Sequence, residues 1–315
     1  MAKRQQRREF LKVTAAASAG FWAAGGVTAK TSTSANEVIR WACVGVGGKG
    51  TSDSNDAARH GDIVGICDID EGNLSKASDK WPKAQKFYDY RKMIEKLGDN
   101  VDAITVSTPD HNHAPAAALS LKAGNHTFTQ KPLTHTIEEA RHLATLAKEA
   151  SVQTQMGNQG TASSTLRRSA ALLKAGIVGK VSEVHVWTNR PVWPQGGGRP
   201  TDKPEVPANI HWNEFLGPAK HRPYHPAYTP FKWRGWWDFG TGALGDMACH
   251  TLNMPFMGLD LFDPTSVVAE TSGHNKETYP SQCKIVFEFP EYNGRDALTL
   301  HWYDGGFKPP RSLFP

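Results

Sequence analysis

A glycine-rich stretch near the start of the chain has the residue types and spacing of a dinucleotide site. The sequence GVGGKG at 45–50 follows a strand-like run, 38–44, and precedes a segment, 51–60, that can form a helix. In such a unit the first glycine allows a tight turn and the second lets the backbone approach a pyrophosphate. The third permits close packing of the helix, whose N-terminus receives the anion. The cofactor-binding residues that this pattern predicts are Gly45, Gly47 and Gly50.

An acidic residue stands where such a site selects its nucleotide. A second apolar run, 63–67, ends in Asp68, eighteen residues after Gly50. A carboxylate there can accept hydrogen bonds from both ribose hydroxyls of NAD and would repel the 2′-phosphate of NADP. The alternative role for Asp68 is to cap the next helix. The sequence therefore favours NAD over NADP.

A carboxylate and an imidazole form a second candidate for chemistry. Asp246, His250 and Asn253 stand at i, i+4 and i+7 of a helix expected to begin after Gly245, so they share one face. A carboxylate one turn before a histidine can fix its tautomer and orientation, which gives a general base with a near-neutral pKa. The alternative is an exposed surface pair.

The elements that must position these residues alternate between strands and helices. Beyond the first two strands we expect strands at 101–106, 126–129 and 152–156, with helices at 114–123 and from Thr136 to Ala150. This alternation predicts a parallel, doubly wound sheet of the Rossmann type.

The composition changes after residue 156. We expect a helix at 164–175 and then the strands of an open, mostly antiparallel sheet, at 182–187, 266–270, 283–288 and 297–302. The predicted fold class is α/β, with an N-terminal Rossmann domain followed by an α+β domain. The predicted boundaries are 1–35 for an export signal, 36–156 for the nucleotide-binding domain and 157–315 for the second domain.

Two polar loops follow strands of the predicted parallel sheet. They are STPDHNH at 107–113 and QKPL at 130–133. Ligands of open α/β sheets bind at the carboxyl ends of the strands, so these loops should face the reactive end of the cofactor. Asp110, His111 and His113 also offer three metal-binding side chains. We predict no metal site, because no second cluster at zinc-like spacing accompanies them.

Together with 45–50 and the segment GTGALGDMACHTLN at 240–253, these loops make the chain resemble the Gfo/Idh/MocA family of oxidoreductases. The resemblance runs from about residue 38 to the end. It implies hydride transfer between a nicotinamide cofactor and a secondary hydroxyl or ketone of a sugar, cyclitol or glycoside. Family members generally continue beyond the point where this chain stops, so we expect a shortened second domain or a fragment.

The resemblance also implies roles for single residues. Lys131 matches the active-site lysine of the family, in Gln-Lys-Pro where the family usually has Glu-Lys-Pro. In the implied mechanism His250 removes the hydroxyl proton, Lys131 stabilises the oxygen, and Asp246 orients His250. The residues that match the cofactor cleft of the family are Thr108, Pro109, His113 and Gln130.

The segment between the predicted helix at 164–175 and the helix expected after Gly245 is rich in aromatic residues. Six tryptophans fall between Trp187 and Trp237, both included. Indole rings suit the apolar faces of sugars, and they also pack loops, so we expect both uses. The polar side chains nearby that could bind substrate hydroxyls are Asn189, Arg190, Arg234 and Asp238.

The N-terminal segment resembles an export signal. RREFLK at 7–12 is similar to the twin-arginine signal of bacteria, whose translocon moves folded proteins, and an uncharged run follows at 13–29. The alternative is a short membrane anchor, which the three glycines in this region disfavour as a stable span. We expect a periplasmic or otherwise exported protein that carries tightly bound NAD with it, because little free NAD is present outside the cytoplasm.

Charge and cysteine content exclude some partners. Residues 1–29 carry +4 of the formal charge of +5, which leaves +1 for a chain that begins at Lys30, so we predict no nucleic-acid partner. Four widely spaced cysteines are predicted to be free thiols.

The resemblance implies a homo-oligomer through the second sheet. Two alternatives to a dehydrogenase stay open, a redox-neutral glycoside hydrolase or lyase and a non-catalytic sugar-binding relative.

Overall fold

The computed structural model describes residues 38–314, so the predicted export signal at 1–35 lies outside the described residues. Within the described part, no helix is long and apolar enough to cross a membrane. All four cysteines are free, as predicted, since none is paired in a disulfide.

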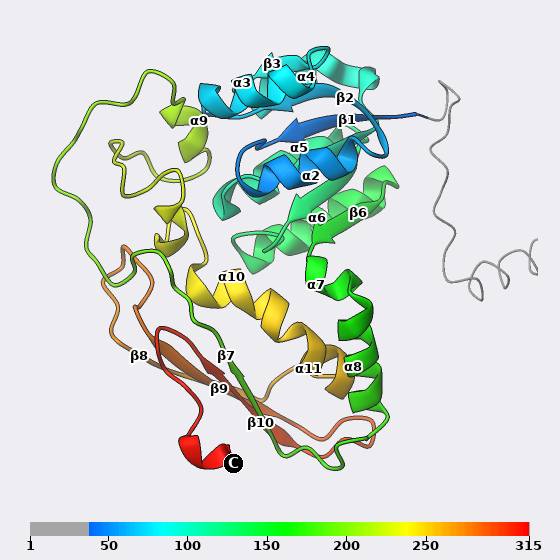
Figure 1. The fold of residues 1–315 in the computed structure, drawn as a ribbon, viewed down its shortest axis with the longest axis vertical. Coiled ribbons are helices and arrows are strands. Elements are labelled where there is room, and N and C mark those ends of the chain that lie inside the picture. The colour runs from blue at the N-terminus through cyan, green and yellow to red at the C-terminus, as the bar shows by residue number, and fades with distance from the viewer. Residues whose placement is uncertain (1–37, 315) are drawn as a thin grey trace, which may run out of the picture. The chain divides into compact units, whose positions relative to one another are not determined.

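The N-terminal half contains a six-stranded sheet in which every strand is parallel to its neighbours (Figure 1). The strand order β3-β2-β1-β4-β5-β6 is that of a doubly wound dinucleotide fold, whose order reverses between β1 and β4. The strands are β1 (Ile39–Val44), β2 (Gly61–Cys67), β3 (Gln85–Phe87), β4 (Ala103–Val106), β5 (His126–Gln130) and β6 (Thr154–Gly157).

Helices cover both faces of this sheet. They are α2 (Lys49–Ala57), α3 (Glu71–Lys80), α4 (Tyr90–Leu97), α5 (His113–Lys122) and α6 (Ile137–Ala150). Successive residues of β1 point to opposite faces, so Cys43 packs with α2 and α3 while Ala42 packs with α4 and α5. A capping box begins α6, where the Thr136 hydroxyl accepts from the N–H of Glu139 and the Glu139 carboxylate accepts from the N–H of Thr136.

The C-terminal half contains a second, four-stranded sheet in the order β7-β10-β9-β8. Two of its three strand pairs are antiparallel, and β7 and β10 are parallel. Its strands are β7 (Glu183–Trp187), β8 (Ser266–Thr271), β9 (Cys283–Phe289) and β10 (Leu298–Tyr303), and its main helices are α8 (Ser164–Lys174), α10 (Gly242–Thr251) and α11 (Asn253–Leu259). Figure 1 shows α10 and α11 between the two sheets.

One face of the second sheet supports α10. Val186, Ile285 and Trp302 form a buried cluster, against which Leu244 and Met247 of α10 pack. This contact turns the opposite face of α10 toward the carboxyl ends of the parallel strands. The described residues also form short helices, in which η denotes a 3₁₀ helix. They are α7 (Gln159–Ala162), α9 (Trp212–Leu216), η1 (Gly98–Asn100), η2 (Asp110–Asn112), η3 (Lys232–Gly235) and η4 (Arg311–Leu313).

The predicted fold class is confirmed, while several elements differ in detail. The bounds of α3, β3 and α4 were not predicted from the sequence. The prediction that a helix begins after Gly245 is wrong, because α10 begins at Gly242. Asn253 begins α11, so it does not continue the helix that carries Asp246 and His250.

Candidate active site

A cavity of about 580 Å³ lies at the carboxyl ends of β1, β2, β4 and β5. Its other wall comes from the C-terminal half, in particular from 229–234 and Asp246. This volume is in the range of small-molecule sites. The predicted site residues that line the cavity are Gly45, Gly47, Asp68, Thr108, Pro109, His113, Gln130, Lys131 and Asp246. The predicted residues Gly50 and His250 are not among its lining residues.

The glycine-rich turn closes tightly against the neighbouring loop. Gly45 has φ +78°, and a Cβ there would lie 2.6 Å from the carbonyl oxygen of Ser107. A Cβ on Gly50 would overlap the carbonyl oxygen of Gly45, so Gly50 serves the packing of α2 on the turn. Side chains are thus excluded where β1 enters α2, and the cavity is bounded there by backbone. Such a cradle fits the pyrophosphate of a dinucleotide.

Asp68 lies at the cavity wall and also holds the glycine-rich turn. Its Oδ2 accepts hydrogen bonds from the N–H groups of Val46 (2.9 Å) and Gly47 (3.0 Å), and its Oδ1 accepts from Asp70 (2.9 Å). Burial raises the pKa of the Asp68 carboxyl, and these backbone hydrogen bonds oppose that rise. The cap of α3 is instead Asp70, whose side chain accepts from the N–H of Gly72.

A buried carboxylate that the sequence analysis did not identify connects three parts of the cavity wall. Asp53 of α2 pairs with Lys49, and its Oδ2 accepts from Ser107 Oγ (2.7 Å) and Gln130 Nε2 (3.0 Å). The predicted residue Gln130 therefore uses its amide within the protein. These contacts join the turn after β1 to the ends of β4 and β5.

Two histidines of the loop after β4 are buried and used in the structure. The ring nitrogens of His113 lie 2.7 Å from the carbonyl oxygen of Pro132 and 2.8 Å from that of Thr108. His111 spans the carbonyl oxygens of Phe239 (Nδ1, 3.1 Å) and Phe215 (Nε2, 2.8 Å). Burial lowers the pKa of His111 to about 4. The two rings therefore connect loops.

Lys131 and Asp246 meet at the other end of the cavity. Lys131 Nζ donates to Asp246 Oδ1 at 2.7 Å and to the Asp246 carbonyl oxygen at 2.9 Å. Both side chains are largely buried, with 15% and 13% of their surface exposed. Arg234 Nε also approaches Asp246 Oδ1, at 3.4 Å, and lines the same cavity. The Lys131–Pro132 peptide bond is cis.

A further carboxylate lines the same cavity. Asp110 is buried and accepts from Thr241 Oγ1 at 2.7 Å. Burial raises the pKa of Asp110, while His113 and the hydrogen bond from Thr241 oppose that rise. The sequence placed Asp110 in a loop expected to face the cofactor, without a catalytic role.

The predicted orientation of His250 by Asp246 has no hydrogen bond between the two side chains to support it. The Asp246 carboxylate is directed to Lys131 and Arg234, and among the described residues no hydrogen bond of the His250 side chain is formed. The charges of Lys131 and Asp246 nevertheless both affect the pKa of His250. Burial lowers its pKa, the Lys131 charge lowers it further, and the Asp246 charge opposes the decrease. His250 is half-buried, one turn after Asp246.

Most of the predicted sugar-binding aromatic residues are packing residues. Trp212, Trp233 and Trp236 belong to one buried cluster, and of these only Trp233 lines the cavity. The Arg234 guanidinium lies over the Trp233 ring, 4.2 Å from its centroid. Of the polar side chains predicted to bind hydroxyls, Arg234 lines the cavity, whereas Asn189, Arg190 and Asp238 do not.

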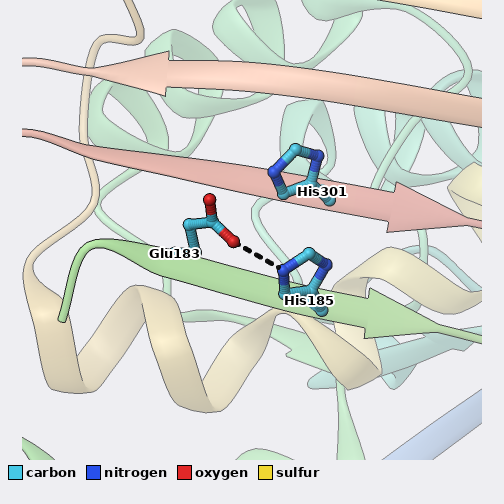
Figure 2. Close-up of side chains that lie close together, drawn as sticks. All are labelled: Glu183, His185 and His301. Atoms are coloured by element: carbon cyan, nitrogen blue, oxygen red, sulfur yellow. Dashed lines mark hydrogen bonds and ion pairs between the residues drawn. The ribbon is translucent and has the colours of Figure 1, made fainter. Parts of the chain in front are cut away.

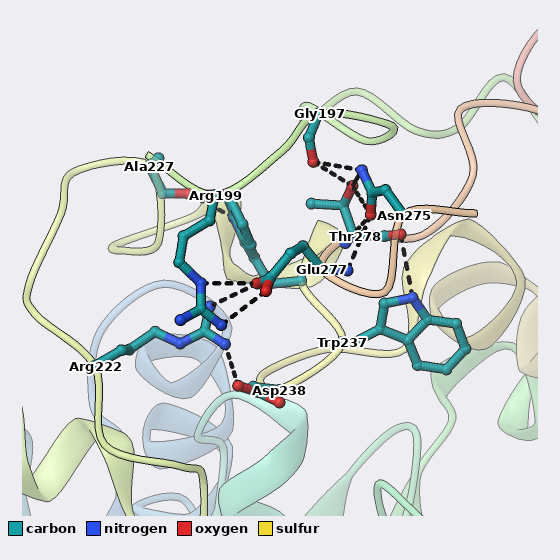
Figure 3. Close-up of polar contacts among 10 residues, drawn as sticks. Gly197, Arg199, Arg222, Ala227, Trp237, Asp238, Asn275, Glu277 and Thr278 are labelled. Atoms are coloured by element: carbon teal, nitrogen blue, oxygen red, sulfur yellow. Dashed lines mark hydrogen bonds and ion pairs between the residues drawn. The ribbon is translucent and has the colours of Figure 1, made fainter. Parts of the chain in front are cut away.

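A polar network holds the long aromatic segment against the loop before β9 (Figure 3). Arg199 forms two hydrogen bonds with Glu277, of 3.0 and 2.8 Å, and Asn275 connects the backbone at Gly197 with Thr278. Arg222, which is buried, pairs with Asp238. Asp238 thus serves the loop structure, which explains its distance from the cavity.

The structure also brings together three side chains for which the sequence analysis predicted no role. Glu183, His185 and His301 place one ligand-type atom each within 4.8 Å of the others. The alternation Glu-x-His on one strand was a visible signal, because such residues share a face. The third member lies on β10, and only the register of the sheet brings it close.

Both halves of the chain match models of one family of oxidoreductases. Residues 39–158 match the family model described as "Oxidoreductase family, NAD-binding Rossmann fold", and residues 166–294 match "Oxidoreductase family, C-terminal alpha/beta domain". The chain belongs to the Gfo/Idh/MocA family. The predicted cofactor, NAD, is confirmed at the level of this family.

The curated relatives match less than half of this chain. An uncharacterized oxidoreductase, YdgJ of Escherichia coli K12, is 29% identical over 136 residues, which are 41% of this chain and 39% of the relative. An alpha-N-acetylgalactosaminidase of Shewanella oneidensis is 29% identical over 166 residues, which are 42% of this chain and 35% of the relative. The match thus spans less than half of either relative.

Solved structures share the fold at low identity. GenD2 from gentamicin A biosynthesis, solved with NAD, superposes with a TM-score of 0.64 and 20% identity, covering 90% of this chain and 70% of GenD2. An inositol dehydrogenase homolog of Azotobacter vinelandii, solved with NAD⁺, gives a TM-score of 0.64 and 20% identity, covering 87% of this chain and 66% of the homolog.

Proposed function

We propose that this protein is an NAD-dependent oxidoreductase that acts on a secondary hydroxyl or ketone of a sugar, cyclitol or glycoside. The observation that carries the proposal is a single cavity with two different ends. A backbone-lined turn forms one end, and the Lys131–Asp246 pair forms the other. Such a cavity can hold a dinucleotide along its length and place its reactive ring near a positioned ammonium group.

The residues at the Lys131 end supply proton chemistry and orientation. A bound nicotinamide would accept or return the hydride. Lys131, held by Asp246, donates a hydrogen bond to the substrate oxygen and stabilises its negative charge. His250, whose pKa is lowered, is neutral at neutral pH and is our candidate for the base that takes the hydroxyl proton. Asp246 acts on Lys131 in this scheme.

His250 must reach the substrate for this role. It stands one helical turn after Asp246, the residue of α10 that lines the cavity. Catalytic contacts often tighten only when substrate is bound. His250 is half-buried and close in sequence to Asp246, so it is our candidate although it does not line the cavity. Asp110, which is buried and lines the same cavity, is the alternative base.

A redox-neutral glycoside hydrolase or lyase is the second candidate. The names of several curated relatives favour it, since they are an alpha-N-acetylgalactosaminidase and glycosyl hydrolase family 109 proteins. In that reaction a sugar hydroxyl is oxidised, the adjacent acidified C–H loses its proton, the glycosidic bond breaks by elimination, and the same cofactor returns the hydride after water adds. Both candidates use the same cavity.

We further propose that the protein is exported through the twin-arginine translocon to the periplasm and carries NAD with it. The motif at 7–12 supports this. Fusing residues 1–35 to a reporter that is active only outside the cytoplasm tests it. Reporter activity that is present with the natural sequence and lost in the double variant Arg7→Lys, Arg8→Lys supports export through the twin-arginine translocon. A reporter that stays inactive in the cytoplasm contradicts it.

The function is tested by incubating the purified protein with glycosides and sugars and analysing the products by mass spectrometry. A keto-sugar with reduced cofactor supports the dehydrogenase. Free sugar released without an external electron acceptor supports the redox-neutral cleavage. If protein loaded with NAD forms neither product from any substrate offered, both enzyme proposals are contradicted. That result favours a non-catalytic sugar-binding relative.

A further inference from the structure

The outer face of the mixed sheet carries a carboxylate and two imidazoles that the proposed reaction does not use. Glu183 and His185 are two residues apart on β7, so their side chains point to the same face. His301 of β10 lies directly opposite His185 in the parallel ladder. The intervening residue Val184 points to the other face, where it joins the core under α10 and α11.

These three side chains converge at short range. Figure 2 shows the rings of His185 and His301 one above the other, with the Glu183 carboxylate beside them. The ring centroids are 4.6 Å apart with planes 7° apart, and Glu183 Oε2 lies 3.1 Å from His185 Nε2. One ligand atom from each residue lies within 4.8 Å of the others. Ligand atoms around tetrahedral Zn²⁺ are about 3.3 Å apart, so rotations of the side chains would bring the set to bonding distance.

The surroundings of the cluster also suit a metal ion. His185 Nδ1 lies 3.1 Å from the Tyr303 hydroxyl, while its Nε2 faces Glu183. Metal-binding histidines usually have such a partner on the second nitrogen. His301 Nδ1 is buried and has no hydrogen-bond partner among the described residues. A buried polar atom of this kind requires an explanation, and a ligand would provide one.

We propose that Glu183, His185 and His301 bind a divalent first-row transition metal ion, with Zn²⁺ as the reference ion and water in the fourth position. Two imidazoles and one carboxylate are a donor set typical of Zn²⁺. The ion links β7 to β10 on the face opposite α10. Its role is therefore to stabilise this parallel strand pair, and it takes no part in hydride transfer.

The test is a titration of tag-free full-length protein, stripped with EDTA, with Zn²⁺ in a calorimeter and with Co²⁺ followed by visible absorption. We expect one ion per chain, a tetrahedral Co²⁺ spectrum and a higher melting temperature with Zn²⁺. His185→Gln and His301→Gln should each weaken binding at least about 100-fold, because loss of even an outer partner of a metal ligand costs up to that much. His60→Gln, at an exposed position, should bind as the unmodified protein does.

Two milder variants keep the test decisive if a histidine variant does not fold. Glu183→Gln removes the carboxylate at a half-exposed position, and Tyr303→Phe removes only the hydroxyl beside His185. Both should weaken Zn²⁺ binding while circular dichroism stays unchanged. No binding by the unmodified protein at millimolar Zn²⁺, or equal affinity in folded variants, overturns the proposal.

Discussion

The two ends of the cavity each place a lysine against a carboxylate, but they are assembled differently. At the glycine-rich end, Lys49 pairs with Asp53 four residues later in the same helix, and both belong to the Rossmann half. At the other end, Lys131 pairs with Asp246, 115 residues away on α10. The first pair forms once the parallel sheet is folded. The second exists only when the C-terminal half covers that sheet.

This difference in assembly corresponds to a difference in function. Asp53 accepts additional hydrogen bonds from Ser107 and Gln130, so it holds neighbouring loops in place. Asp246 engages Lys131 and Arg234, two cationic groups that face the cavity. We infer that the glycine-rich end binds the cofactor and that the Lys131 end carries out the reaction. Substitutions at the two ends should then affect different kinetic constants.

The largest expected effect comes from Lys131→Ala. Turnover should fall about 1,000-fold, because loss of a positioned donor to a developing oxyanion has an effect of that size. NAD affinity should change little, since the glycine-rich end is untouched. Steady-state kinetics and a fluorescence titration with NADH measure the two quantities. Lys122→Ala, at an exposed position of α5, is the control, and a similar loss there would remove the distinction.

The contact between the two halves should make stability depend on pH through His111. Its ring joins the carbonyl oxygens of Phe215 and Phe239, and burial lowers its pKa to about 4 from the ordinary 6.5. As pH falls below 6.5 the unfolded chain takes up this proton first, so stability decreases until about pH 4. The loss is about 3 kcal/mol of unfolding free energy.

Urea unfolding at several pH values measures this loss, with His111→Gln as the comparison. The variant is expected to be less stable at pH 7 and to lack one proton's worth of pH dependence between 6.5 and 4. An identical slope in the variant would show that His111 is not the responsible group.

The next effect concerns the proposed base. His250→Ala should lower the rate of hydroxyl oxidation about 100-fold. Because the pKa of His250 is lowered, oxidation in the unmodified protein should decline only as pH falls through a value below 6.5, where the imidazole becomes protonated. That acid limb should be missing in the variant. If instead it persists in His250→Ala and disappears in Asp110→Asn, Asp110 is the base.

Nucleotide selection should be a property of the glycine-rich end alone. Asp68→Asn is expected to weaken NAD binding about tenfold, as expected for hydrogen bonds to a charged group, and to narrow the preference for NAD over NADP. The turnover number at saturating NAD should be nearly unchanged. Asp89→Asn is the control, because that carboxylate caps α4 and does not line the cavity. Equal affinity in Asp68→Asn would remove Asp68 from the binding site.

The smallest effect is expected for Lys49→Ala. Its ammonium group is partly exposed and already paired with Asp53. Asp53 keeps its hydrogen bonds from Ser107 and Gln130 when this one partly exposed ammonium is lost, so NAD affinity should fall only about two- to fivefold with no change in turnover. Isothermal titration measures the affinity. A loss of turnover comparable with that of Lys131→Ala would show that the two lysines are not functionally distinct.

The same difference explains what could be predicted from the sequence. Gly45 and Asp68 follow strands directly and Gly50 lies in the first turn of α2, so local patterns and the rules of parallel sheets located them. Lys131 was identified through the resemblance to a family and Asp246 through helical spacing and that resemblance, but their mutual pairing was not predicted. The helical spacing of Asp246 and His250 did not indicate this pairing, because spacing along one helix says nothing about a lysine from another element.

Two further features could not be obtained from local patterns. Asp53 lies in a polar helix without a distinctive motif, and its role depends on three loops meeting at the sheet edge. The approach of His301 to His185 depends on the register of β7 and β10, which are separated by more than a hundred residues. Short strands such as β3 carry too few residues for a periodic signal.

The most direct test of the two-ended cavity is to denature the purified protein and Lys131→Ala and to identify any released dinucleotide by mass spectrometry, alongside the products formed from a panel of sugars and glycosides. We predict that both proteins release NAD or NADH and that only the unmodified protein forms keto-sugar or free sugar. Absence of a dinucleotide from the unmodified protein, or equal product formation by Lys131→Ala, would contradict the account.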